Sequence, residues 1–252
     1  MLGLRYKDKV MFNGCKRLLA SNPRSGMNWL KLMFECAEAM NKFGSIKYEY
    51  IYDSWVVYPL TTCYGLRLVY PFDERSTGSN FDDIQNCKKN AFPYVFQTFN
   101  RFEDLSCSDK FDVKTVMLDR DIVNVVESFL LINGFNVENQ DDFFCGTDLQ
   151  RFIRVKKSWY RQKKIRPDFV NIVKYDDLKD DTFNVLCGIC DFFDMGFDDD
   201  VLKVVVGECT WDKMSGKIPA GLRKMNKRMN FNENKGSILS MKNIKRIRDL
   251  EA

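Results

Sequence analysis

Residues suited to binding oxyanions occur at two places where a predicted strand is followed by a predicted helix. The first is residues 23–29, with the sequence PRSGMNW, which contains Arg24 and Gly26. The second contains Arg120 and, eight residues further on, Ser128. A guanidinium group binds an oxyanion through two parallel hydrogen bonds, and serine hydroxyls and helix N-termini add further donors. These residue types therefore predict a site for a phosphate or sulfate group.

The loop at residues 23–29 has the chemistry of an anion-binding turn. The unpaired N–H groups at the start of a helix and the helix dipole both favour negative charge. Gly26 permits close approach of the backbone, and Arg24 adds a fixed positive charge. The loop lacks the Lys and the Ser or Thr of the G-x-x-x-x-G-K-[ST] motif of ATPases. An ordinary tight turn that caps a helix is the alternative interpretation.

Arg120 and Ser128 have structural alternatives too. Arg120 could form a salt bridge with Asp119 or Asp121, and Ser128 could be a hydroxyl on the surface of a helix. Their spacing behind a predicted strand favours anion binding instead.

The hydrophobic pattern predicts strands that alternate with helices. Strands are expected at residues 16–20, 94–98, 113–118 and 169–174, and helices at 28–42, 121–133, 148–161, 182–193 and 198–209. This alternation predicts an α/β fold, a three-layer sandwich with a central, mostly parallel sheet flanked by helices. Ligands of such sheets bind at the carboxyl ends of the strands. We find no repeat or linker, so residues 1–252 are predicted to form one domain.

Composition and charge indicate a globular protein and exclude some classes of enzyme. Hydrophobic residues make up 45% of the 252 residues, which is enough for a sizeable core. Residues 213–252 contain 11 basic and 3 acidic side chains, which suggests either an anionic ligand or a solvated basic segment. The chain has no His, so a Ser-His-Asp triad is excluded.

The nine cysteines form no disulfide or zinc framework, and the C-x-x-C of Cys187 and Cys190 lies in an apolar stretch that favours a core role. Unpaired cysteines suit a reducing compartment. There is no apolar run long enough to span a membrane and no signal-like N-terminus. We therefore expect a cytoplasmic protein.

The loop of residues 23–29 resembles the P-[KR]-S-G-T-T-W loop of the PAPS-dependent sulfotransferases, where PAPS is 3'-phosphoadenosine-5'-phosphosulfate. That loop grips the 5'-phosphosulfate, which implies binding roles for Arg24, Ser25, Gly26, Met27, Asn28 and Trp29. Met27 and Asn28 replace the two Thr of the family, so Met27 offers only its backbone N–H. The resemblance also implies a fold like that of the P-loop nucleotide kinases.

Two further segments resemble the parts of this family that hold the nucleotide's 3'-phosphate. Arg120 and Ser128 match R-[ND]-x-x-D-x-x-x-S, with Asn124 in place of the Asp. Residues 234–243 resemble R-K-G-x-x-G-D-W-K-N, whose loop closes over the same phosphate and implies roles for Lys235 and Gly236.

Aromatic residues match the adenine side of the family's site. Tyr175 begins a YDDL segment similar to Y-E-D-L, whose Tyr lies near the adenine. Trp211 lies in a segment similar to T-S-F-x-x-M, whose aromatic packs on the base. Trp29 would stack on the opposite side of the adenine.

The family's catalytic base is not found at its usual place. Cytosolic members have K-T-H after a strand, and the nearest match here is Gln97-Thr98-Phe99. Phe99 stands where the His would be and cannot accept a proton. Carboxylates that could substitute are Glu103 first, then Asp104 and Glu35; otherwise the acceptor needs little deprotonation.

The resemblance implies a sulfotransferase that moves a sulfuryl group from PAPS to a hydroxyl or amine of a small-molecule or glycan acceptor. The second product would be PAP, adenosine 3',5'-bisphosphate. Arg24 and Ser128 would act in catalysis, with Glu103 as the candidate base. We expect no metal and no nucleic-acid partner, and the oligomeric state is left open.

A catalytically silent PAPS- or PAP-binding protein is the alternative, and a P-loop kinase is disfavoured by the missing Lys. Residues 48–101 would form much of the acceptor pocket. All of this requires that Arg24, Arg120 and Ser128 meet in the folded chain.

Overall fold

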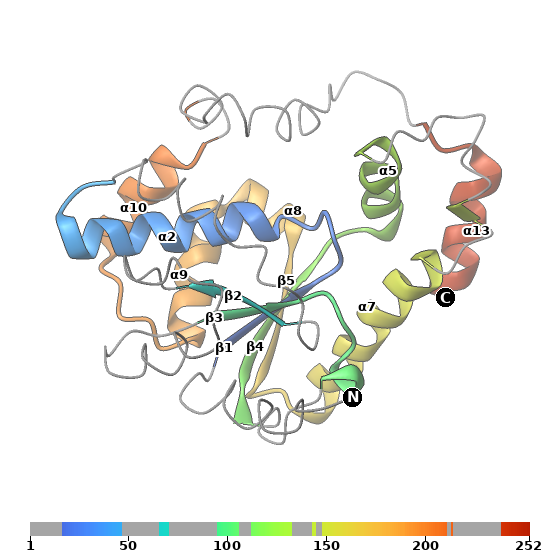
Figure 1. Cartoon of the computed structure of the whole chain (residues 1–252), viewed down its shortest axis with the longest axis horizontal. Coiled ribbons are helices and arrows are strands. Elements are labelled where there is room, and N and C mark those ends of the chain that lie inside the picture. Colours follow the sequence, from blue (N-terminus) through green and yellow to red (C-terminus); the bar gives the residue numbers. More distant parts are fainter. Residues whose placement is uncertain are drawn as a thin grey trace, which may run out of the picture.

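A computed structural model describes residues 17–46, 66–70, 95–105, 112–132, 143–144, 148–210, 213 and 238–252. Its centre is a five-stranded sheet with the order β2-β3-β1-β4-β5. Figure 1 shows helices packed around this sheet, with the helices α2, α9 and α10 toward one end of the view and α5, α7 and α13 toward the other.

The sheet is mostly parallel, as predicted. The strands are β1 (Arg17–Ser21), β2 (Leu66–Tyr70), β3 (Val95–Thr98), β4 (Lys114–Asp119) and β5 (Val170–Lys174). β1 pairs in parallel with β3 and β4, and β4 pairs in parallel with β5. β2 runs antiparallel to β3. The carboxyl ends of β1, β3, β4 and β5 therefore lie at one edge of the sheet, where the predicted ligand site would be.

The predicted helices are all present, with ends shifted by a few residues. The helical elements are α2 (Met27–Phe43), η3 (Phe102–Asp104), α5 (Ile122–Ile132), α7 (Asp148–Ile165), α8 (Tyr175–Asp180), α9 (Thr182–Phe192), α10 (Asp199–Glu208) and α13 (Met241–Glu251). The sequence pattern did not predict β2, η3, α8 or α13. None of the helices in these described ranges is both long enough and apolar enough to cross a lipid bilayer.

Alternation along β1 divides the core between the two faces of the sheet. Leu19 packs in a cluster with α2, α9 and α10. Leu18 and Ala20 point to the other face, where they pack with Trp159 of α7. Because successive side chains of a strand point to opposite faces, one short strand serves both layers of helices. This is the three-layer sandwich that the sequence predicted.

A third cluster lies beyond the sheet, where α5, α7 and α13 pack together. Its fully buried members include Val126 of α5 and Ile247 of α13, and Phe152 of α7 is almost fully buried. This cluster holds α13 beside α5, the helix that carries Ser128.

Cys187 and Cys190 lie on α9. Cys190 is buried in the first core cluster, and Cys187 packs against that cluster. The C-x-x-C is therefore part of the core, as predicted.

Candidate active site

The loop between β1 and α2 has an unusual backbone at two positions. Arg24 has φ 71° and Gly26 has φ 87°, both in the left-handed region. A left-handed conformation costs a non-glycine residue roughly 1–2 kcal/mol, so Arg24 stores strain of the kind found at functional sites. These two residues turn the chain sharply, and α2 begins at Met27, the residue after Gly26.

The N-terminus of α2 is open to an anion. Its N-cap residue is Gly26, which supplies no side-chain cap, and its first turn contains no acidic residue. The positive end of the helix dipole is therefore not compensated by the helix itself. An anionic ligand at this point would satisfy backbone N–H groups that the helix leaves unpaired.

Tyr175 explains why residue 26 is a glycine. A Cβ atom at this position would lie 2.6 Å from Cδ2 and 2.7 Å from Cε2 of the Tyr175 ring, which is closer than real Cβ atoms come. Tyr175 begins α8 directly after β5. The ring thus packs against the loop that follows β1, and it joins two strand ends at one site.

Arg24, Arg120 and Ser128 meet at this loop. Arg24 Nε donates a hydrogen bond to Ser128 Oγ over 3.2 Å. Arg120 Nη1 donates to the carbonyl oxygen of Arg24 over 2.8 Å. The Arg120 guanidinium also lies over the Tyr175 ring, 4.7 Å from its centroid. The ends of β1, β4 and β5 therefore bring these side chains together.

The two arginines form a concentrated positive charge. Burial lowers the pKa of Arg24, and the nearby charge of Arg120 lowers it further. Two guanidinium groups this close repel each other, so an anion bound between them would be stabilising.

Several buried polar atoms beside the arginines have no hydrogen-bond partner within the described ranges. They are Ser21 Oγ, Ser25 Oγ and Arg120 Nε. A buried polar atom normally has a partner. The residues present therefore fit a multiply charged phosphate ester such as PAPS, which would supply acceptor oxygens to these donors.

The acidic neighbours of Arg120 are engaged elsewhere. Asp119 accepts a hydrogen bond from Tyr160 over 2.6 Å and pairs with Lys156 at 3.1 Å. Asp121 pairs with Arg248 at 2.6 Å and accepts a hydrogen bond from a backbone N–H of α5. Within the described part of the chain no acidic side chain pairs with Arg120, so the salt-bridge alternative is not what the structure shows.

Trp29, which the resemblance predicts to stack on the adenine, lies in the first turn of α2. It is half-buried, and its Nε1 donates to the carbonyl oxygen of Cys209 over 2.8 Å. Asn28 is also half-buried, whereas the Met27 side chain is part of the core. Three other predicted binding residues lie outside the described residues: Trp211, Lys235 and Gly236.

Phe99 follows β3 at the same edge of the sheet as Arg24 and Arg120. Its ring packs against the core cluster that contains α2. Phe99, which the resemblance aligns with the His of cytosolic sulfotransferases, therefore has a packing role.

Glu103 is held by two partners on α7. Its carboxylate accepts a hydrogen bond from Ser158 Oγ over 2.6 Å and pairs with Arg161 at 2.7 Å. Partial burial acts to raise the pKa of Glu103, but the hydrogen bond from Ser158 and the charge of Arg161 bring it below its usual value. A carboxylate with a lowered pKa is a weaker base.

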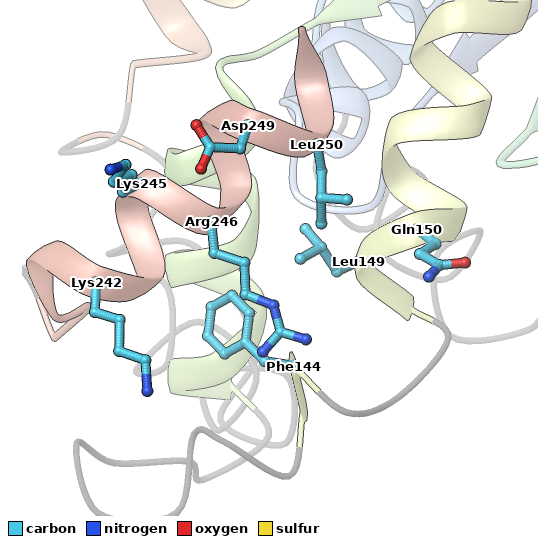
Figure 2. A pocket seen from close by; sticks show the side chains of 8 residues that line it. All are labelled: Phe144, Leu149, Gln150, Lys242, Lys245, Arg246, Asp249 and Leu250. Atoms are coloured by element: carbon cyan, nitrogen blue, oxygen red, sulfur yellow. The ribbon is translucent and has the colours of Figure 1, made fainter.

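A cavity of about 320 Å³ lies away from this site, between α13 and the start of α7. Figure 2 shows Leu250 of α13 facing Leu149 of α7, and the Arg246 side chain next to the Phe144 ring. None of the predicted site residues lines this cavity.

Two features of the site were not predicted from the sequence. The contact between Gly26 and Tyr175 joins segments about 150 residues apart, and no local pattern signals it. The sequence also did not predict the ion pair between Arg248 of α13 and Asp121, the residue after Arg120. The alternation of apolar and charged residues in α13 was a usable signal, because apolar residues recur there at helical spacing.

Comparisons with known proteins identify the family of the chain and its fold. A profile of the sulfotransferase domain matches residues 16–244. The fold resembles mouse sulfotransferase SULT7A1 complexed with PAP, with a TM-score of 0.62 and 14% identity over 98% of this chain and 86% of that chain.

The fold also resembles two structures of retinol dehydratase. One is in complex with androsterone and inactive cofactor PAP, with a TM-score of 0.56 and 13% identity over 98% of this chain and 83% of that one. The other is in complex with retinol and PAP, with a TM-score of 0.55 and 13% identity over 98% and 84%. A comparison with curated protein sequences finds no match. Because the sulfotransferase profile spans most of the chain, the protein belongs to the sulfotransferase family.

Proposed function

We propose that the enzyme transfers the sulfuryl group of PAPS to a hydroxyl or amine of a small-molecule or glycan acceptor. The observation that carries the proposal is the meeting of Arg24, Arg120 and Ser128 at the start of α2. Two cations, a serine hydroxyl and an open helix N-terminus together suit a ligand with several negative charges.

The loop of residues 23–29 and the segment from Arg120 to Ser128 would bind different phosphate groups of the nucleotide. Arg24 and the first N–H groups of α2 would bind the 5'-phosphosulfate. Arg120 and Ser128 would bind the 3'-phosphate, together with Lys235 and Gly236. Trp29 and Trp211 would stack on the adenine, with Tyr175 nearby.

Transfer forms a bond between the acceptor atom and sulfur while the bond from sulfur to the 5'-phosphate oxygen breaks. Negative charge then grows on the departing phosphate. Arg24 is placed to stabilise it, and preorganised charge of this kind is usually the largest contribution to catalysis. The acceptor must also lose a proton. With Phe99 at the family's base position, Glu103 is the first remaining candidate base, but its carboxylate is already engaged by Ser158 and Arg161. We therefore favour an acceptor with an acidic hydroxyl, which needs no base.

A silent PAPS- or PAP-binding protein is the second candidate. It is favoured by one specific observation, the packing of Phe99 where the family has its His. Loss of a general base lowers rates by about 10²–10⁴-fold, which is enough to leave binding without useful turnover.

Calorimetry with PAP and transfer of radiolabelled sulfate from PAPS to a panel of phenols, amines and saccharides test the proposal together. We expect PAP binding and at least one labelled product. PAP binding without any product would favour the silent protein. Absence of PAP binding would overturn both the active enzyme and the silent binding protein. Arg24→Ala is the negative control, because removing this guanidinium should weaken PAP binding and abolish transfer.

We also propose that residues 1–252 act as one domain and that the enzyme works in the cytoplasm. All four cysteines in the described part of the chain are free, which supports a reducing compartment.

A further inference from the structure

Asp119 and Asp121, the two neighbours of Arg120, are joined by a continuous series of ion pairs. Asp119 pairs with Lys156 at 3.1 Å, and Lys156 pairs with Glu251 at 2.9 Å. Glu251 pairs with Arg248 at 3.0 Å, and Arg248 pairs with Asp121 at 2.6 Å. Charges alternate in sign along these five residues, and both ends of the chain flank Arg120.

The two middle members on α13 are Arg248 and Glu251, and α13 is firmly docked. Its Ile247 is fully buried between α5 and α7. Leu250 faces Leu149 of α7 in Figure 2. Lys157 of α7 also donates to the carbonyl oxygen of Leu250 over 3.4 Å. A helix fixed by apolar contacts can hold the charged ends of its side chains in place.

The network also determines which groups remain available to pair with the Arg120 guanidinium. Asp119 is buried, and its Lys156 partner offsets its charge. Asp121 is satisfied by Arg248 and by the backbone of α5. Arg120 is left with the Arg24 carbonyl and the Tyr175 ring, and its buried Nε has no partner among the described residues. If Arg248 were removed, Asp121 would become a competing partner for the Arg120 guanidinium.

We infer that α13 positions Arg120 for the 3'-phosphate, with Arg248 and Glu251 as positioning residues that never touch the nucleotide. This inference rests on the proposed role of Arg120 and goes beyond it, because recognition of one phosphate then depends on α13, a helix that packs on α5 and does not itself bind the nucleotide. The inference requires that loss of the network weakens binding of the 3'-phosphate specifically.

The test compares PAP with AMP, which has the same 5'-phosphate and adenosine but lacks the 3'-phosphate. Affinities for both are measured by calorimetry on the full chain and on Arg248→Ala and Glu251→Gln. We expect the Kd for PAP to rise about 3- to 30-fold, the range found for mutations along coupling networks. The Kd for AMP should stay within about 2-fold, as for substitutions away from a binding site.

Two variants serve as controls. Arg248→Lys keeps the charge and should keep PAP affinity close to that of the unmodified chain. Lys203→Ala removes an exposed ion pair with Asp200 on α10, at 2.9 Å, and should change neither affinity. Circular dichroism on each variant establishes that the fold is retained.

The outcomes separate this inference from the proposed function. An unchanged ratio of PAP to AMP affinity in Arg248→Ala and Glu251→Gln overturns the positioning role. So does a parallel loss of both affinities, which indicates general destabilisation, and so does a loss in Arg248→Lys as large as in Arg248→Ala. If the unmodified chain itself does not prefer PAP to AMP, the assignment of Arg120 to the 3'-phosphate fails first.

Discussion

Arg24 donates from Nε to the hydroxyl of Ser128 over 3.2 Å, although 104 residues separate the two in the chain. The bond joins the loop after β1 to the middle of α5. It places a cation and a hydroxyl side by side near the start of α2. The two side chains should therefore act as one unit when nucleotide binds.

A double-mutant cycle on Arg24→Ala and Ser128→Ala tests this coupling. Residues in contact typically show interaction energies of about 0.5–3 kcal/mol, so the losses of PAP binding energy should not add. Calorimetry on both single variants and the double variant gives the value. A cycle that pairs Arg24→Ala with Lys203→Ala should be additive. Additive losses for Arg24 and Ser128 would show that they bind independently.

Arg24→Ala and Arg120→Ala should affect different kinetic constants. Arg24 would stabilise charge that develops during transfer, so its loss should lower kcat by about 10²–10³-fold. Arg120 would bind a phosphate that does not react, so its loss should raise KM for PAPS with little change in kcat. Steady-state kinetics with varied PAPS measures both. The reverse pattern would exchange the two roles.

Gly26→Ala should damage both the loop and the fold. The added methyl group would meet the Tyr175 ring at 2.6 Å, in a backbone conformation with φ 87°. We expect the free energy of unfolding to fall by about 1–3 kcal/mol and PAP binding to be lost. Gly188→Ala in α9 is the matched control, because its Cβ would meet nothing within 4 Å. Equal free energies of unfolding for Gly26→Ala and Gly188→Ala, measured by chemical denaturation, would contradict this explanation.

Tyr175 should be needed for its ring rather than its hydroxyl. The Arg120 guanidinium lies over the ring face, an arrangement that stabilises by about 0.5–2 kcal/mol. Tyr175→Phe should therefore keep PAP affinity, and Tyr175→Leu should weaken it. Equal losses in both variants would indicate instead that the hydroxyl contacts the nucleotide.

Glu103→Gln separates a structural carboxylate from a catalytic base. The pKa of Glu103 is lowered in the folded chain, so its contribution to stability is present above the usual pKa of 4.5 and is lost as the pH falls through the folded value. Denaturation at neutral pH should find Glu103→Gln less stable than the unmodified chain, and the difference should shrink in acid. Turnover should be nearly unchanged, whereas loss of a true base would cost about 10²–10⁴-fold.

Much of the fold could be predicted from local patterns. β1, β4 and β5 read as apolar runs followed by polar turns, and the helices as repeats of apolar residues at helical spacing. β2 was missed because it lies within residues 48–101, which were assigned to the acceptor pocket and, before the strand expected at 94–98, to no strand or helix. α8 was missed because YDDL is too short for a periodic signal, and α13 because its residues were matched to a loop motif.

The sequence by itself determined which residues could bind a nucleotide, because residue type sets donors and charge, and a strand followed by a helix sets a free helix N-terminus. Only the tertiary structure decided which of them meet. The contact of Gly26 with Tyr175 and the ion pairs that flank Arg120 join segments far apart in the chain. Such contacts depend on the order of strands in the sheet and on the docking of α13. Local spacing can indicate that α13 is a helix, but not which distant side chains it contacts.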